Sequence, residues 1–269
     1  MTSLNEIKLV ALDIDGTLLA PGVKPTALPD SAMTDAVQSL MAAGVTVALA
    51  TGRMYPGTVR IAEHLGITQP LICQQGASTH ALDGTLLHNR SIDHDIAREL
   101  AAFAVSEGWP YAWFDHERYL VSEPNPASQY FAEVSGVAFE EHAAPHESDV
   151  VPVGIDIIST REHAGAIHAG LQERYGDRVE LLDFGLVTAV HAAQASKGTA
   201  LAALAGELGY SAAQVLAIGD SANDASMLRW AGHGAAPEHS DRYARNAADE
   251  ILTGAGVDGV SSLLRTLSQ

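Results

Sequence analysis

The sequence predicts an α/β protein whose core is a doubly wound, Rossmann-like parallel sheet with a second α/β domain inserted into it. Apolar runs such as KLVALD, VTVALA and VLAIGD alternate with segments of helical periodicity, which is typical of a parallel sheet covered by helices on both faces. This alternation stops at about residue 78 and resumes at about residue 189. Between those points hairpins and strand pairs predominate, which indicates an inserted domain.

The first part of the core is expected to run strand, helix, strand, helix, strand. Its first helix carries Met33, Val37 and Leu40 on one face and ends at Gly44, a residue typical of helix C-termini. The expected strands lie at residues 8–13, 45–50 and 70–73, and the expected helices at 31–43 and 58–65.

The second part of the core begins where Ser196 is expected to cap a helix that Gly209 ends. VLAIGD then forms a buried strand. The remaining expected elements are a helix at residues 224–230, short strands at HGAA and EIL, and a closing helix from Val260. Residues 1–77 and 189–269 are therefore predicted to form the core, and residues 78–188 the insert.

The insert has its own strand and helix signals. THALDGTLLH predicts a hairpin with Asp83 and Gly84 in its turn. Two further strand pairs are expected at YAWFD with RYLVS and at VELLD with LVTAV, a single strand at VGIDIIS, and helices at residues 93–107 and 162–175. PNPAS and EEHAAPHESD are expected to be loops because of their composition.

The charge balance limits the partners of the protein. With 15 Lys and Arg against 33 Asp and Glu, the formal net charge is -18, which repels nucleic acid and anionic membrane surfaces. The same field repels a phosphorylated substrate, so a site for an anion must be built from local donors and a bound cation.

The remaining bulk features favour a soluble, cytoplasmic protein. The chain starts without a secretory signal pattern and lacks an apolar run of the ~18 residues that a membrane helix needs. Cys73 is the only cysteine, so no disulfide forms within the chain, and it is expected in the core. We expect a monomer or small homo-oligomer.

Four polar motifs follow strands or begin a helix of the expected core: DIDGT, ATGR, SKG and GDSAND. Each alone has an ordinary structural explanation, such as an Asp-Gly turn, a helix cap at Thr51 or a solvated Lys197. Ligands of doubly wound sheets bind outside the carboxyl ends of the strands, so the four together indicate one ligand site. The spacing excludes an EF-hand and a P-loop, and the 12 histidines show no metal-ligand spacing.

DIDGT, ATGR, SKG and GDSANDASML together resemble the motifs of the haloacid dehalogenase-like (HAD) phosphohydrolases. The insert resembles the large α/β cap, of C2 type, in the Cof-type sugar-phosphate phosphatases of that superfamily. The resemblance implies a Mg²⁺-dependent phosphatase that hydrolyses small phosphorylated metabolites, with sugar phosphates as the expected class.

The resemblance also implies roles for the carboxylates. Asp13 would be the nucleophile that forms an aspartyl-phosphate, and Asp15 the general acid and then the general base. Mg²⁺ would be held by the Asp13 carboxylate, the Asp15 backbone carbonyl and Asp220, with Asp224 as a further ligand or a support. A dication between the carboxylates and the phosphate explains why two aspartates are tolerated two positions apart.

Other residues are implied to hold the substrate. Thr51 and Lys197 would bind phosphoryl oxygens, and Gly52 would allow close backbone approach. Asn223 would orient Lys197 or a metal-bound water, while Arg53 would either contact substrate or brace the site.

The chain departs from the family pattern in two places. Gln74, Gln75 and Gly76 stand where relatives commonly carry an Asn-Gly pair, which leaves the role of Gln75 open. Pro237 and Glu238 stand where relatives often carry a Gly-Asn-Ala loop, so substrate fit at that edge is not copied from the family.

Substrate choice is expected to lie in the cap. The candidates are aromatic and basic residues at strand spacing, although such aromatics are more often part of a core. They are Tyr111, Trp113, Phe114, His116 and Arg118. Two other functions stay open: a phosphotransferase or sugar phosphomutase that uses the same site, and a non-catalytic phosphometabolite-binding protein. The sequence does not separate hexose, triose or tetrose phosphates from pyridoxal phosphate or flavin mononucleotide.

Overall fold

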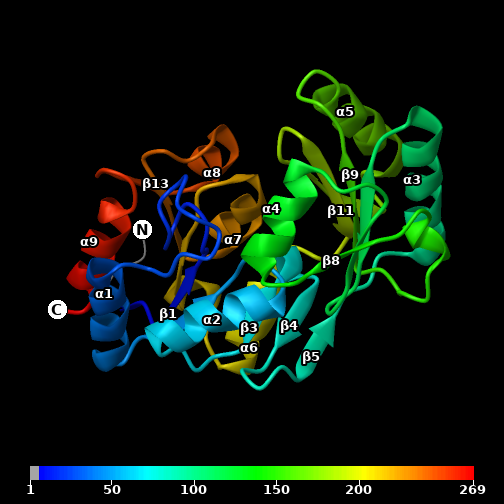
Figure 1. Cartoon of the computed structure of the whole chain (residues 1–269). Coiled ribbons are helices and arrows are strands. Elements are labelled where there is room, and N and C mark those ends of the chain that lie inside the picture. Colours follow the sequence, from blue (N-terminus) through cyan, green and yellow to red (C-terminus); the bar gives the residue numbers. More distant parts are fainter. Residues whose placement is uncertain (1–5) are drawn as a thin grey trace.

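The computed structural model describes residues 6–269, which form two lobes (Figure 1). The core lobe contains the parallel sheet that the sequence predicts, and its five strands lie in the order β14-β13-β12-β1-β2. Its strands are β1 (Leu9–Leu12), β2 (Thr46–Leu49), β12 (Val215–Ile218), β13 (His233–Pro237) and β14 (Glu250–Leu252).

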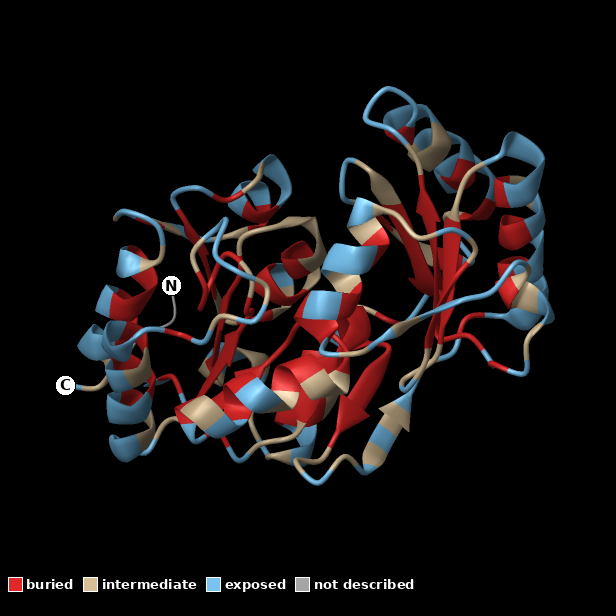
Figure 2. Cartoon of the chain, in the orientation of Figure 1, coloured by how far each residue is buried: buried red, intermediate tan, exposed pale blue. Residues whose placement is uncertain are grey.

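Helices cover both faces of this sheet, because successive residues of each strand point to opposite faces and both sets are apolar. In β1, Val10 and Leu12 pack with the first helix layer, whereas Leu9 and Ala11 pack with the second. The first layer holds α1 (Ser31–Ala42), α2 (Tyr55–Leu65) and α9 (Asp258–Leu267), and the second holds α6 (Lys197–Glu207), α7 (Ala225–Trp230) and α8 (Arg242–Ala247). Figure 2 shows the resulting buried interior of the core lobe.

The third expected strand lies at the edge of the core sheet. β3 (Leu71–Cys73) meets β2 through one parallel bridge, Ala50 with Ile72, and pairs with the hairpin β4 (Ser78–His80) and β5 (Leu86–Asn89). The hairpin turn at Asp83 and Gly84 is confirmed. The sequence placed the boundary between core and cap at residue 78, and this boundary stays a prediction. Because the hairpin pairs with β3 of the core lobe, we propose that the cap begins after β5.

The second lobe is an α/β cap built on a six-stranded sheet in the order β10-β11-β9-β6-β7-β8. Neighbouring strands are antiparallel except β7 and β8. The strands are β6 (Tyr111–Phe114), β7 (Tyr119–Val121), β8 (Phe139–Glu141), β9 (Gly154–Ile158), β10 (Val179–Asp183) and β11 (Val187–Ala192). α3 (His94–Glu107) and α5 (Ala164–Tyr175) cover one face, while α4 (Pro126–Ser135) lies on the side toward the core (Figure 1).

The structure corrects the expectation that PNPAS is a loop. Asn125 caps α4 by accepting hydrogen bonds from the backbone N–H groups of Ala127 and Ser128, and Pro126 occupies the first turn, where its missing N–H costs nothing. The composition is typical of a loop, but the order Asn-Pro is typical of a helix start.

EEHAAPHESD is likewise not wholly loop, because β8 ends in it and a short 3₁₀ helix spans Pro145–Glu147. α2 begins at Tyr55 rather than residue 58, and α8 was not expected. Within residues 6–269, none of the helices combines the length and apolar character needed to cross a bilayer.

The cap contacts the core where α4 crosses the start of α2. The backbone N–H of Met54 donates to Ser135 Oγ at 3.2 Å. At Gly57, an added Cβ would lie 2.2 Å from the carbonyl oxygen of Val134, so glycine is what lets the two backbones approach. This contact sets the position of α4 over the carboxyl ends of the core strands.

Candidate active site

The predicted motifs converge at the carboxyl ends of the core strands. Leu12 pairs in register with Leu49 on one side and Ile218 on the other, so the residues that follow these strands become neighbours. Asp13 comes directly after β1, and its backbone N–H donates to the carbonyl of Ile218 at 3.0 Å. The Asp13 side chain is buried among them.

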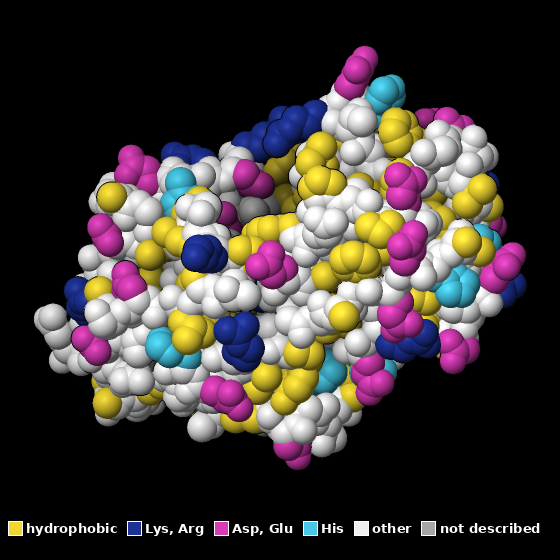
Figure 3. All heavy atoms as spheres, viewed as in Figure 1, with side chains coloured by type: hydrophobic (Ala, Val, Ile, Leu, Met, Phe, Trp, Pro, Cys, Tyr) yellow, Lys and Arg dark blue, Asp and Glu magenta, His cyan; other side chains and the backbone are white. Residues whose placement is uncertain are grey.

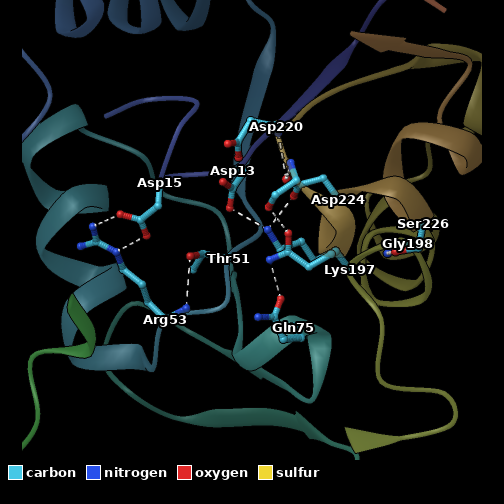
Figure 4. Close-up of polar contacts among 12 residues, drawn as sticks. Asp13, Asp15, Thr51, Arg53, Gln75, Lys197, Gly198, Asp220, Asp224 and Ser226 are labelled. Atoms are coloured by element: carbon cyan, nitrogen blue, oxygen red, sulfur yellow. Dashed lines mark hydrogen bonds and ion pairs between the residues drawn. The ribbon is translucent and has the colours of Figure 1, made fainter. Parts of the chain in front are cut away.

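Lys197 pairs with one carboxylate from each of the two sequence segments that form the core. Ser196 caps α6 as expected and places Lys197 in its first turn, fully buried rather than solvated. Its Nζ lies 2.6 Å from Oδ1 of Asp13 and 2.6 Å from Oδ1 of Asp224 (Figure 4). Burial by itself would lower the pKa of Lys197, but the ion pairs with the two carboxylates raise it above its usual value, so the ammonium stays charged.

The acidic side chains outnumber this one ammonium. Asp13, Asp220 and Asp224 each offer a carboxylate oxygen within 4.8 Å of the others. Burial and repulsion from neighbouring aspartates raise the pKa of Asp13 to about 7 and that of Asp220 to about 8. Oδ1 of Asp220 is buried without a hydrogen-bond partner in the described part of the chain. An all-oxygen cluster with excess negative charge and an unpaired oxygen fits a hard divalent cation such as Mg²⁺.

Glycines keep this cluster open. A Cβ on Gly16 would lie 2.2 Å from Oδ2 of Asp220, and one on Gly219 would lie 2.3 Å from Cγ of Asp224. Gly16 also has a φ of 89°, which disfavours other residues. Oδ2 of Asp224 accepts hydrogen bonds from the backbone N–H groups of Asp220 and Ser221. Asp224 therefore holds this loop in place in addition to pairing with Lys197.

Arg53 holds Asp15 instead of pointing at Asp13. Its Nε donates to Oδ2 of Asp15 at 2.8 Å and its Nη2 donates to Oδ1 at 2.5 Å, a bidentate pair (Figure 4). The guanidinium is buried, whereas the Asp15 side chain is 40% exposed. Of the two readings left open for Arg53, this geometry favours the brace.

Thr51 and Gln75 come from the ends of β2 and β3. The Thr51 hydroxyl accepts the backbone N–H of Arg53 at 3.2 Å, and α2 starts later, so Thr51 is not the helix cap. Gln75 has a φ of 61°, unusual for a non-glycine residue, and its amide oxygen accepts Nδ2 of Asn223 at 2.8 Å. Gln75 therefore reaches the site, and Asn223 contacts Gln75 rather than Lys197.

A cavity of about 520 Å³ connects this site with the cap. Asp13, Asp15, Thr51 and Arg53 line its core end, and mainly apolar side chains line its cap end. Figure 3 shows hydrophobic side chains gathered where the two lobes face each other.

Of the cap candidates, only Phe114 lines this cavity. Tyr111 and Trp113 lie on the opposite face of the cap sheet and belong to the core under α3 and α5. They are therefore core residues, the more common role of aromatics at strand spacing. Arg118 pairs at the surface with Glu140 and Asp149.

Several cavity residues were not identified from the sequence. Asp156 and His191 lie on the cavity face of the cap sheet, and Tyr130 lies on α4. A single aspartate inside the apolar strand GIDII was the available signal, because a carboxyl group in a buried strand needs a reason. His239 Nε2 lies 2.8 Å from the carbonyl oxygen of Gly16, which ties the Pro237–Glu238 segment to the DIDGT loop.

The family model of the haloacid dehalogenase-like hydrolases matches residues 10–264, and the chain belongs to this family. The phosphatase YwpJ of Bacillus subtilis is 26% identical over 292 residues, covering 97% of this chain and 100% of the relative. A solved haloacid dehalogenase-like hydrolase from B. subtilis superposes with a TM-score of 0.82 at 25% identity, covering 96% and 99% of the two chains.

The fold is also that of a solved sugar phosphatase of HAD subclass IIB, with a TM-score of 0.79 at 21% identity over 96% of this chain and 98% of that chain. The family and the fold class expected from the four motifs and the insert are thereby confirmed.

Proposed function

We propose that the protein is a Mg²⁺-dependent phosphatase that hydrolyses small phosphorylated metabolites through an aspartyl-phosphate on Asp13. One observation carries the proposal: the buried Asp13 carboxylate is paired with Lys197 and faces Asp220, whose Oδ1 has no partner in the described chain. Relatives that cover most of the chain are named phosphatases, which supports this activity. Sugar phosphates are the substrate class expected from the resemblance.

In the first step an oxygen of Asp13 attacks phosphorus, and the bond from phosphorus to the leaving-group oxygen breaks. Asp15 donates the proton that this oxygen needs. Both Asp15 oxygens accept hydrogen bonds from Arg53, so one of these bonds must be released when Asp15 carries the proton, while the other keeps the carboxyl group oriented at the cavity. In the second step Asp15 takes a proton from a water that attacks phosphorus. Phosphate is released and the Asp13 carboxylate is restored.

Positive charge around the phosphoryl group lowers the barrier of both steps. Lys197 lies beside Asp13 and opposes the negative charge that spreads over the phosphoryl oxygens, and the Thr51 hydroxyl offers a further contact. Mg²⁺, held by Asp13 and Asp220 with support from Asp224, would add charge neutralisation of the same kind.

Product analysis with varied Mg²⁺ tests this proposal. The purified protein is incubated with phosphorylated sugars, cofactors and nucleotides, with Mg²⁺ or with chelator, and both inorganic phosphate and ester products are measured. We expect release of phosphate that depends on Mg²⁺ and falls at least about 100-fold in Asp220→Asn. An isomeric ester without phosphate release would indicate a phosphomutase, and binding without either product would indicate a phosphometabolite-binding protein.

A further inference from the structure

The cap end of the cavity is built from aromatic and aliphatic side chains. Phe114, Tyr119 and Phe131 contact one another, with ring centroids 4.8 to 6.0 Å apart. Tyr130 and Phe184 also line the cavity while being 54% and 43% exposed. Large apolar groups left open around a cavity indicate that something apolar covers them.

One carboxyl group interrupts this apolar wall. Asp156 is 6% exposed and lines the cavity, yet its side chain has no hydrogen bond or ion pair among residues 6–269. Burial raises its pKa to about 7, because the surrounding protein offers the charged form no stabilising partner. A carboxyl group buried at this cost in a cavity wall points to a ligand group that pairs with it.

The strand register leaves room for such a ligand. Asp156 lies in β9 with Ala112 of β6 on one side and Ala189 of β11 on the other, so the neighbouring side chains are small. Ala189 lines the cavity as well. The two cross-strand neighbours of Asp156 are therefore small, and the carboxyl group faces the cavity.

His191 closes the patch on one side. It opposes Gly154, where a Cβ would lie 2.7 Å from the His191 ring, and it contacts Phe114 edge-on with ring centroids 5.9 Å apart. Burial lowers the pKa of His191 to about 4, so the ring is neutral and adds no positive charge for Asp156 to pair with.

We propose that this cavity selects phosphate monoesters whose leaving group is a flat, largely apolar ring with a hydrogen-bond donor on the side away from the phosphate, and that Asp156 accepts this donor. The inference rests on the proposed phosphatase site, because that site fixes the phosphate at the core end of the cavity. The aromatic side chains then contact the ring, and Asp156 and the phosphate site bind its two ends.

A polyhydroxylated sugar fits this cavity less well. Each hydroxyl that leaves water needs a new partner, and burying it without one costs free energy. Apart from two tyrosine hydroxyls, the cap contributes only Asp156 and His191 as polar side chains to the described lining. The inference thus moves the expected substrate from sugar phosphates toward ring-containing phosphates.

Binding of matched phosphonates tests the inference without requiring turnover. Calorimetry compares p-aminobenzylphosphonate, which carries the donor, with benzylphosphonate, which lacks it, on the full-length protein with Mg²⁺. We expect the donor to tighten binding by about 10-fold or more in the wild type and the gain to disappear in Asp156→Ala. Asp177→Ala, an exposed cap aspartate, is the control and should keep the preference.

Kinetics with matched esters separates this inference from the proposed function. We expect kcat/KM for p-aminophenyl phosphate to fall about 10- to 100-fold in Asp156→Ala, while that for phenyl phosphate changes less than about 3-fold. Each ester is compared with itself in the wild type and in the variant, so the different reactivities of the two leaving groups do not affect the comparison.

Equal binding of the two phosphonates, survival of the preference in Asp156→Ala, or a higher kcat/KM for glucose 6-phosphate than for p-aminophenyl phosphate would overturn the inference. If phenyl phosphate is still hydrolysed with Mg²⁺ in those cases, the proposed function stands alone. A clear phosphonate preference with no phosphate release from any ester would support the ligand class and contradict the phosphatase.

Discussion

Lys197 is a fully buried cation of the active site, and three buried or half-buried aspartates surround it. Its replacement by alanine leaves the carboxylates of Asp13 and Asp224 without their shared partner. Removing one member of a buried ion pair typically costs about 3–5 kcal/mol of stability, because the remaining charge is desolvated and unpaired.

Lys197→Ala is therefore expected to lower both thermal stability and turnover. Turnover should fall about 100- to 1,000-fold, the range for loss of one group that stabilises transition-state charge. Steady-state kinetics and thermal unfolding measure the two effects. Lys8→Ala removes an exposed lysine and should change neither, and wild-type kinetics in Lys197→Ala would reject the role given to this residue.

Asp156→Asn is expected to stabilise the protein in a pH-dependent way. Because folding raises the pKa of Asp156 from 3.8 to about 7, its contribution to stability is fully present below pH 3.8 and is lost as the pH rises toward 7. An asparagine does not titrate, so the advantage of the variant should grow by about 2.6 kcal/mol between pH 5 and pH 8. Denaturant unfolding at the two pH values measures this. An advantage that is the same at both would contradict the raised pKa.

At the residue scale, strand ends made most of the site predictable. Asp13, Thr51 and Asp220 follow apolar strands, and parallel strands bring such residues to one edge. Asp156 stands out as the one carboxyl group in an apolar strand, but its place in the site depends on how the cap sheet faces the core, which the strand pattern does not indicate. The contacts of Asn223 with Gln75 depend likewise on a left-handed backbone at Gln75 that its sequence does not indicate.

Gly57 controls the contact between α2 and α4. A Cβ there would lie 2.2 Å from the backbone oxygen of Val134. This oxygen can move away only if the backbone of α4 moves with it. Since α4 carries Tyr130 and Phe131, displacement of this helix changes the cap end of the cavity.

We expect Gly57→Ala to lower kcat/KM about 10-fold and to lower the melting temperature by several degrees, because the cap and core backbones must separate. Gly206→Ala in α6 is the matched control: nothing lies within 4 Å of its added Cβ, so it should be neutral or stabilising by up to about 1 kcal/mol. Equal behaviour of the two variants would show that the α2–α4 contact does not position the cap.

Elements with strong periodicity or clear end signals were predicted well. The helix capped by Asp93 and the helix capped by Ser196 begin where the sequence indicates. α4 was missed because its loop-like composition hid the Asn-Pro start. β3 was expected in the core sheet, but only one bridge joins it to β2, and it pairs mainly with the hairpin. Such edge pairing depends on the whole domain and not on the strand itself.

At the scale of the whole molecule, a bound cation should stabilise the fold. Without a cation the pKa of Asp13 is about 7 and that of Asp220 about 8, so protons compete with Mg²⁺ for these oxygens below those values. Saturation at about 100 times the dissociation constant adds about 2.7 kcal/mol.

Mg²⁺ is therefore expected to raise the melting temperature more at pH 8 than at pH 6, and chelator should reverse the increase. Differential scanning calorimetry at both pH values measures this, with Asp220→Asn as the variant that should lose the response. A Mg²⁺ effect that is equal in that variant would mean that the cation binds elsewhere.

The central claim is that Asp13 carries the chemistry, and one measurement tests it most directly. Phosphate release with Mg²⁺ is followed for the wild type and for Asp13→Asn, and acid-quenched samples are digested to weigh the peptide that contains residue 13. The account predicts that Asp13→Asn folds but releases no phosphate, and that the wild-type peptide gains the mass of one phosphoryl group during turnover. Undiminished phosphate release from Asp13→Asn would contradict it.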